Sequence, residues 1–299
     1  MRATPTLDPH FLFLDSNRAY HQHLYGRLVE RDGDGRYIPG LAESWRTVDP
    51  LRWRFTLRRN VTFHNGTAFT ADDVVFSFAR VPAIPGNPAP YTYYLTSITG
   101  VEKVDDHTVD IVTSRPNPLI PIQTNGISIV SRAATGGKAP GDFATGVAAI
   151  GTGPYRFVEY RSGERLVLER FDGFRGEPPY WRRVEFRMLA NNAARTAALL
   201  AGDVDLIDNV SPVDADRLAD NSAVAVHRSP SARIIYLGAT ISLGQSPLTT
   251  DATGQPLATN PLADLRVRRA ISLAVNRPAI VERVLGGYGE AASQLAVVG

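Results

Sequence analysis

The stretch Val61-Thr-Phe-His-Asn-Gly-Thr-Ala-Phe-Thr-Ala-Asp-Asp-Val-Val-Phe-Ser77 decides the local fold. Asn65-Gly66 is typical of a tight turn, because both residues tolerate positive φ angles. Thr70 precedes Asp73 by three residues, which is the spacing of a capping box at a helix N-terminus. The apolar residues that follow recur at helical spacing. The sequence therefore predicts a tight turn and then an amphipathic helix through Arg80.

Strand patterns lie on both sides of this turn and helix. Residues 52–58 alternate as Arg-Trp-Arg-Phe-Thr-Leu-Arg, so their apolar side chains share one face of a half-buried strand. Residues 97–104 and 107–113 predict two more strands joined by a short polar turn. Residues 153–160 and 164–170 predict a further hairpin. Antiparallel pairing between neighbouring segments is therefore expected.

Helix patterns alternate with further strand patterns toward both ends of the chain. Residues 16–28 predict a helix, because apolar residues recur four apart on one face. Ser16 or Asn17 is its expected cap. The later expectations are strands over 183–189, 203–208, 223–228 and 233–240, and helices over 192–201, from Pro212, from Asp264 and from Asn276. This alternation predicts a mixed α/β fold with more than one sheet.

The composition is that of an ordinary globular protein. The chain has 299 residues, of which 43% are hydrophobic and 21% are charged, and this excludes disorder, collagen and coiled coil. The 32 basic residues are scattered and nearly balanced by 30 acidic ones, so no nucleic-acid partner is expected. The absence of cysteine excludes disulfides and thiolate metal sites. The length favours about two domains, and the small, glycine-rich residues 131–149 are a candidate crossover between them.

No motif in the chain predicts catalysis, a cofactor or a metal site. Gly151-Thr-Gly153 precedes Pro154-Tyr155 rather than a helix, so it predicts a turn into a strand and not a phosphate loop. His21 and His23 point to different sides of a helix, and the other histidines are isolated in sequence. We therefore expect a binding protein and not an enzyme.

Four segments, in matching order and spacing, resemble the extracellular solute-binding proteins of peptide and nickel ABC transporters, known as family 5. The resemblance covers nearly the whole chain, and the four motifs in register make it specific. The first two segments are Leu7-Asp-Pro-His10 with Leu24-Tyr-Gly-Arg-Leu28, and Pro39-Gly-Leu-Ala-Glu-Ser-Trp45 with the strand, turn and helix quoted above. The last two are Ile150-Gly-Thr-Gly-Pro-Tyr-Arg-Phe157 with Gly163-Glu-Arg-Leu-Val-Leu-Glu169, and Leu265-Arg-Val-Arg-Arg-Ala-Ile-Ser-Leu-Ala274 with Asn276-Arg277.

The resemblance implies an α/β, periplasmic-binding-protein-like fold of type II, cluster C, with two lobes and an inserted extra domain. The ligand of such a protein binds between lobes that close around it. The implied division assigns residues 1–25 and 148–233 to lobe I, 26–147 to the inserted domain, and 234–299 to the start of lobe II. The second lobe is then incomplete in this chain.

The resemblance also implies which residues line the ligand cleft. They are Phe13, Leu14, Asp15, Tyr91, Ile235, Tyr236 and Gly238. Asp15 is expected to receive a ligand cation, Tyr91 to cover an apolar side chain, and the crossing strand at 233–240 to pair with an extended peptide. Local roles stay open for three of them: Asp15 as a helix cap, Tyr91 in loop packing and Tyr236 in the core. Gly151, Gly153 and Trp45 are assigned to the fold.

The function implied is that of the substrate-binding protein of an ABC importer. It captures short peptides in the periplasm and delivers them to the membrane permease and its ATPase, without a cofactor, and it is expected to be a monomer at full length. Met1-Arg-Ala-Thr-Pro5 has no apolar core, so we expect no signal peptide in this chain. The alternatives are another family substrate (an opine, glutathione, a nickel chelate or a sugar), a peptide sensor, or a truncated remnant without function.

The expected truncation has a physical consequence. A crossing strand at 233–240 without its sheet exposes unpaired edge groups. The chain alone is therefore expected to be less soluble than a full-length version and to bind peptide poorly.

Overall fold

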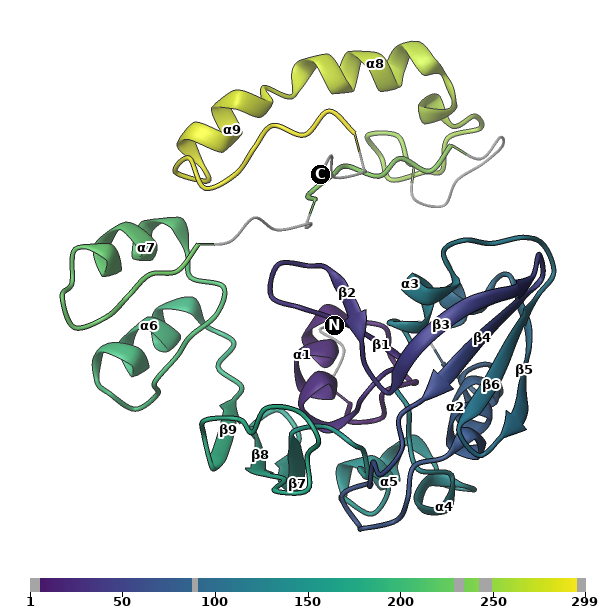
Figure 1. Ribbon diagram of the computed structural model, residues 1–299. Coiled ribbons are helices and arrows are strands. Elements are labelled where there is room, and N and C mark those ends of the chain that lie inside the picture. Colours follow the sequence, from purple (N-terminus) through teal and green to yellow (C-terminus); the bar gives the residue numbers. More distant parts are fainter. Residues whose placement is uncertain (1–5, 88–90, 229–233, 242–248, 295–299) are drawn as a thin grey trace. The chain divides into compact units, whose positions relative to one another are not determined.

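The residues that the computed structural model describes are 6–87, 91–228, 234–241 and 249–294 (Figure 1). The side chains of Asp15 and Ser16 are outside this description. The chain divides into two compact units, a first unit of residues 1–188 and a second unit of residues 189–299. Each unit is described separately below.

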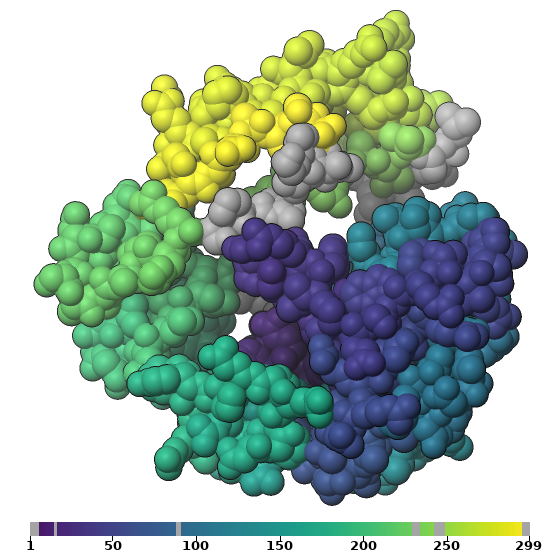
Figure 2. Space-filling view, in the orientation of Figure 1, coloured from purple at the N-terminus to yellow at the C-terminus, as the bar shows by residue number. Residues whose placement is uncertain are grey.

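The first unit contains a four-stranded antiparallel sheet in the order β3-β4-β6-β5 (Figure 1). Its strands are β3 (Ala42–Asp49), β4 (Arg52–Leu57), β5 (Ile98–Asp105) and β6 (Thr108–Thr113). The pairs Trp53↔Ile111 and Phe55↔Val109 fix the register of the two inner strands. In the space-filling view, atoms coloured purple and teal, far apart in sequence, adjoin on one surface of this unit (Figure 2). The predicted strands at 52–58, 97–104 and 107–113 are confirmed.

Helix α2 (Ala71–Ala83) packs against β5 and β6. Its predicted start is confirmed, because the Thr70 backbone N–H donates to the Asp73 carboxylate at 2.9 Å. The second carboxylate oxygen of Asp73 accepts from the backbone N–H of Arg132 at 2.9 Å. The helix runs three residues beyond the predicted end at Arg80. Pro82 lies in the last turn, and the helix ends one residue after it, as expected for a residue that lacks the backbone N–H.

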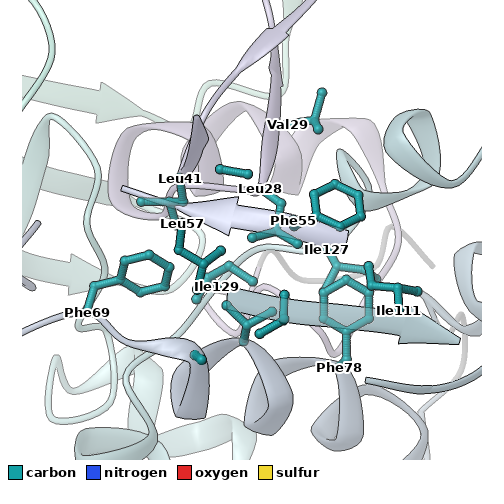
Figure 3. Close-up of a cluster of buried hydrophobic side chains, with 14 of the residues drawn as sticks. Leu28, Val29, Leu41, Phe55, Leu57, Phe69, Phe78, Ile111, Ile127 and Ile129 are labelled. Atoms are coloured by element: carbon teal, nitrogen blue, oxygen red, sulfur yellow. The ribbon is translucent and has the colours of Figure 1, made fainter. Parts of the chain in front are cut away.

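The first hydrophobic core lies between this sheet and α2 (Figure 3). Its buried members all come from residues 28–129. Phe55, Phe63 and Phe69 are at most 2% exposed, and each buried phenylalanine contributes roughly 2–3 kcal/mol of transfer free energy. The Asn65-Gly66 turn delivers Phe69 into this core, with Gly66 at a φ of +82°. The predicted tight turn is therefore confirmed.

A second, three-stranded antiparallel sheet lies in the same unit. Its strands are β7 (Tyr155–Arg161), β8 (Arg165–Arg170) and β9 (Arg183–Arg187), in that order. Helix α1 (Asp15–Leu24) contacts β7, and the rings of Tyr20 and Phe186 meet edge to face at 5.1 Å. The buried residues of this second core come from 7–25 and 130–168. The predicted hairpin and the strand at 183–189 are confirmed.

Helix α1 is shorter than the predicted helix over 16–28. It begins at Asp15 after Leu14, ahead of the expected caps, and Tyr25 is already extended, with φ −124° and ψ 134°. Leu24 and Leu28 are both fully buried, but Leu24 belongs to the second core and Leu28 to the first. The apolar repeat therefore serves two cores, and the chain leaves the helix between them.

The remaining elements of the first unit are short. They are β1 (Val29–Arg31), β2 (Tyr37–Pro39), η1 (Tyr91–Leu95), α3 (Ile120–Thr124), α4 (Arg132–Thr135) and α5 (Pro140–Ala144). Strands β1 and β2 pair as a hairpin. The backbone N–H of Ile129 donates to the carbonyl of Gly26 at 2.8 Å, and Arg27 pairs with Ser128. The segment between Arg27 and Ser128 therefore leaves the rest of the first unit and returns to it at one place.

The second unit contains capped helices in its described part. They are α6 (Asn192–Leu200), α7 (Pro212–Ala219), η2 (Pro261–Ala263), α8 (Leu265–Ala274) and α9 (Arg277–Arg283). The side chains of Asn191, Ser211, Asp264 and Asn276 each accept a hydrogen bond from a backbone N–H in the first turn. The four predicted helices are confirmed. No described helix of the chain is long and apolar enough to cross a membrane.

The strands predicted at 203–208, 223–228 and 233–240 are wrong for the described residues, which form no ladder there. Residue alternation alone does not make a strand, because the backbone groups need a neighbour to pair with. Leu206 is 79% exposed and has no core to pack against. Asn209, with a φ of +51°, ends the first of these stretches.

Candidate functional site

An aromatic cluster of Phe13, Tyr91 and Tyr94 lies beside the start of α1. The ring of Phe13 meets Tyr91 edge to face at 5.1 Å and Tyr94 at 5.6 Å. Tyr91 is 3% exposed, and its hydroxyl faces the carbonyl of Leu12 at 3.5 Å. The cluster therefore joins the loop before α1 to η1.

Gly126 and Tyr93 both lie next to Tyr94 of this cluster. A Cβ atom on Gly126 would lie 2.4 Å from the ring of Tyr94, so only glycine allows the ring to sit there. Tyr93 is 72% exposed and meets Tyr94 edge to face at 5.6 Å. Such offset and edge contacts suit the charge distribution of aromatic rings. Tyr94 is therefore fixed in place, whereas Tyr93 presents an open ring.

Arg18 lies next to the cluster, one turn along α1 from Leu14. Its guanidinium donates to the hydroxyl of Tyr94 at 3.2 Å and to the side-chain oxygen of Asn125 at 3.3 Å. Asn125 is held in turn by its NH2 group, which donates to the carbonyl of Val29 at 3.0 Å. Arg18 therefore binds neutral acceptors that are themselves fixed by the fold.

The electrostatics around the cluster are set by burial and by two arginines. Arg27 forms an ion pair with Glu30 at 3.1 Å. Burial raises the pKa of Glu30 above its usual value, and Arg27 opposes that rise. Burial raises the pKa of Tyr91 to about 12, with Arg18 and Arg27 acting in the opposite direction. Arg18 and Arg27 therefore both act on the Glu30 carboxylate, and Arg27 pairs with it directly.

A buried ion pair anchors the loop that carries Phe13. Arg80 on α2 donates to both carboxylate oxygens of Asp8, at 2.8 and 2.6 Å, and stacks over Phe143 at 4.9 Å. His10 accepts from Arg80 at 3.2 Å through Nδ1, and its Nε2 lies 2.7 Å from the carbonyl of Ser128. The segment 7–10 is therefore pinned to helix α2 before the chain reaches the aromatic cluster.

His10 is neutral in this arrangement. Burial lowers its pKa from 6.5 to about 4, and Arg80 acts in the same direction. The Nε2–H group then donates a hydrogen bond to the carbonyl of Ser128, and the unprotonated Nδ1 accepts one from Arg80. This tautomer satisfies both ring nitrogens, so His10 is a structural group.

A second histidine joins two distant parts of the first unit. His64 Nε2 lies 3.1 Å from the carbonyl of Gly153, and its Nδ1 accepts from the backbone N–H of Gly151 at 3.3 Å. A Cβ atom on Gly151 would lie 1.9 Å from the carbonyl oxygen of Leu24. The predicted role of Gly151 and Gly153 in the fold, rather than in ligand binding, is consistent with this packing.

The predicted site residues fall into two groups. Phe13 and Tyr91 touch, and Leu14 follows Phe13 directly at the start of α1. Asp15 is the first residue of that helix, and its side chain is outside the description. In the second unit, Ile235 and Tyr236 are 79% and 67% exposed, so a core position for Tyr236 is wrong. Gly238 lies in the same segment, 234–241, which contains no helix or strand.

Arg18 and Tyr94 are missing from the predicted set. Arg18 is four residues beyond Leu14, which places both on one face of α1. Tyr94 lies three residues after Tyr91 in a tyrosine-rich run. Helical spacing was thus an available signal for Arg18. The described residues contain no cluster of histidine, aspartate and glutamate that would hold a metal ion.

The fold matches those of solved periplasmic binding proteins. The structure matches that of NikZ from Campylobacter jejuni in complex with Ni(L-His), with a TM-score of 0.78 and 23% identity, over 97% of this chain and 55% of that chain. It also matches the PBP AgaA from A. tumefaciens R10 in complex with agropinic acid, with a TM-score of 0.73 and 26% identity, over 95% of this chain and 54% of that chain.

The sequence comparisons identify the family. Residues 36–298 match the model of the bacterial extracellular solute-binding proteins, family 5 (middle region). The chain therefore belongs to the bacterial extracellular solute-binding proteins, family 5. It is 30% identical over 294 residues to the dipeptide-binding protein of Escherichia coli (strain K12), covering 91% of this chain and 52% of that protein.

The chain spans about half the length of the curated relatives it matches. The predicted family and its α/β fold are confirmed, and an incomplete second lobe fits this coverage. Relatives in the family carry names of periplasmic, peptide-binding proteins.

Proposed function

We propose that this protein is the substrate-binding component of an ABC importer and that it captures short peptides between two lobes. The observation that carries this proposal is family membership together with the 30% identity to a dipeptide-binding protein over 91% of the chain. The protein hands its ligand to a membrane permease, whose ATPase drives transport, and performs no chemistry itself. It works in the periplasm as a monomer at full length.

The lobes in this proposal follow the division expected from the sequence. Residues 1–25 and 148–233 form lobe I, 26–147 the inserted domain, and 234–299 the start of lobe II. The first core draws its buried side chains from residues 28–129, within the range proposed for the inserted domain. The second core draws on 7–25 and 130–168, so it combines residues of lobe I with Val130 and Phe143 from the range 26–147.

The ligand contacts proposed here are those expected from the sequence resemblance. Phe13 and Leu14 form an apolar wall, and Tyr91 supports Phe13 from behind, since its own side chain is buried. Asp15 receives the ammonium group of a peptide. The segment 234–241, with Ile235, Tyr236 and Gly238, offers backbone groups for pairing with a peptide strand, which recognises a peptide without regard to its sequence.

An opine is the second candidate substrate. The observation that favours it is the 26% identity to AgaA, whose structure holds agropinic acid. An opine shares the charged carboxylate of a peptide but lacks a repeating backbone. An opine would contact the polar groups near α1 and would make few contacts with the segment 234–241.

A thermal-shift screen of the full-length protein tests the proposal. The pools are dipeptides, tripeptides, longer peptides, glutathione, opines, sugars and nickel chelates. A ligand at about 100 times its Kd stabilises the fold by roughly 2.7 kcal/mol, which raises the Tm visibly. A shift with one peptide pool supports peptide capture and gives the length class.

The other outcomes separate the alternatives. A shift with opines or chelates alone keeps the transport role and replaces the substrate. No shift with any pool, from folded and ligand-free protein, contradicts the proposal and favours a remnant. A peptide shift in a protein that restores no uptake in a transport assay with its permease favours a sensor.

A further inference from the structure

We propose that Arg18 is a specificity-determining residue that binds a carboxylate group of the ligand. This inference rests on the proposed function and names the chemistry that one part of its site selects. Arg18 is only partly buried, and it uses two of its five N–H donors on Tyr94 and Asn125. The remaining donors are available to a planar anion, which a guanidinium binds through two parallel hydrogen bonds.

Glu30, the described carboxylate whose pKa Arg18 helps to lower, is already paired with Arg27. Arg27, on the same region of the chain, has Glu30 at 3.1 Å, whereas Arg18 forms no ion pair with a described carboxylate. The acceptors of Arg18 are an uncharged hydroxyl and an uncharged amide. A cation that is oriented by neutral groups keeps most of its attraction for an incoming anion.

The scaffold around Arg18 fixes the direction of its guanidinium. Asn125 is 6% exposed and bound to the carbonyl of Val29, and Tyr94 packs on Phe13 over the bare Cα of Gly126. Both acceptors therefore stay in place without a ligand. An arginine that is oriented before binding loses little side-chain entropy when the ligand arrives.

Arg18 also lies where the proposed ligand wall begins. Its backbone N–H donates to the carbonyl of Leu14 at 3.1 Å, so the two residues occupy successive turns of α1. Tyr94 links its guanidinium to Phe13. A carboxylate held at Arg18 therefore places the adjoining part of a ligand against Phe13 and Leu14.

The experiment measures the Kd of a matched ligand pair by calorimetry, using the full-length protein. The pair is the tightest peptide from the screen with a free C-terminal carboxylate and the same peptide with a C-terminal amide. Wild type is expected to prefer the carboxylate form. Arg18→Gln should reduce this preference by roughly 10- to 100-fold, the range for hydrogen bonds to charged groups. Arg18→Lys should retain part of it, because the charge remains and the planar fork is lost.

Two controls separate recognition from general effects. Arg36→Gln removes the same charge from an exposed side chain and should leave the preference unchanged. A Tm within a few degrees of wild type shows that Arg18→Gln is folded, and Tyr94→Phe, which removes one acceptor only, gives a smaller loss in the same direction.

The outcomes distinguish this inference from the proposed function. If Arg18→Gln binds both peptides with the wild-type ratio of Kd values, the assignment of Arg18 is overturned while peptide capture stands. Equal binding of the two forms by wild type also overturns it. If wild type binds no member of any ligand pool, the proposed function fails and this inference fails with it.

Discussion

At the scale of the residue, the first unit depends on neutral histidines and on one buried charge pair. His10, His21 and His64 lie at most 9% exposed, and burial lowers the pKa of each from 6.5 to about 4. Each ring is bound to a backbone carbonyl. The sequence shows only isolated histidines, because the carbonyls that hold them come from residues distant in the chain.

The first prediction concerns stability in acid. The folded-state pKa of these three histidines is below the unfolded value, so the unfolded chain takes up protons first as the pH falls. Above pH 6.5 the three neutral histidines contribute fully to the free energy of unfolding. This contribution is lost between pH 6.5 and about 4, and each histidine loses about 1.4 kcal/mol for each unit by which its pKa is lowered. Urea unfolding at a series of pH values measures this. A free energy of unfolding that stays constant from pH 7 to pH 4 contradicts it.

The second prediction concerns the pair of Arg80 and Asp8. Arg80→Met leaves the Asp8 carboxylate fully buried without its partner, which should cost about 3–5 kcal/mol of unfolding free energy. Arg156→Met, which breaks an exposed pair with Glu169, should cost no more than about 1 kcal/mol. Chemical denaturation measures both. The double variant Asp8→Asn with Arg80→Met should recover part of the loss, and an Arg80→Met loss as small as that of Arg156→Met would overturn the argument.

At the scale of the element, local patterns succeeded wherever a segment carries its own start or stop signal. The capping box at Thr70 and Asp73 and the side-chain caps at Ser211 and Asp264 are satisfied within three residues of the chain. Strands need a partner, and the pattern at 233–240 does not reveal whether one is present. The Arg18 contacts likewise depend on Tyr94 in η1 and on Asn125 at the end of α3, which are 76 and 107 residues away.

The third prediction belongs to the contact between the 151–153 loop and helix α1. Gly151→Ala places a Cβ atom 1.9 Å from the carbonyl oxygen of Leu24, so the loop must move away from the helix end. We expect a loss of about 1–3 kcal/mol or more. Gly33→Ala is the matched control, because no atom lies within 4 Å of its Cβ position. Thermal unfolding measures both changes, and equal Tm values for the two variants contradict the prediction.

At the scale of the whole molecule, apolar burial is unevenly divided between the two units. Among the described residues, the buried hydrophobic side chains of the second unit are Ala215 and Leu218, whereas the first unit has two clusters. Leu273 and Val213 are more than 80% exposed. The division into two units did not follow from composition, because residues 189–299 contain apolar side chains as the first unit does, and only packing separates them.

The fourth prediction is a contrast in hydrogen exchange for the chain of 299 residues. Backbone amides of β4, β6 and α2 should exchange slowly, since they are bonded within a buried core. Amides of α8 and α9 should exchange faster, because none of their described side chains is buried. Exchange measured by mass spectrometry on peptic peptides tests this. Equal protection of β4 and α8 contradicts it, and α1 serves as an internal reference of intermediate burial.

Gly26, Arg27, Ser128 and Ile129 form a junction at which the segment between them leaves the rest of the first unit and returns to it. This junction has a consequence for evolution and for engineering. A segment whose two ends meet can be gained, lost or exchanged in one recombination event, since the host chain is rejoined by a short link without rerouting. The first core would travel with such a segment intact, because its buried residues lie within 28–129. The same junction is a natural place for grafting a reporter domain onto this fold.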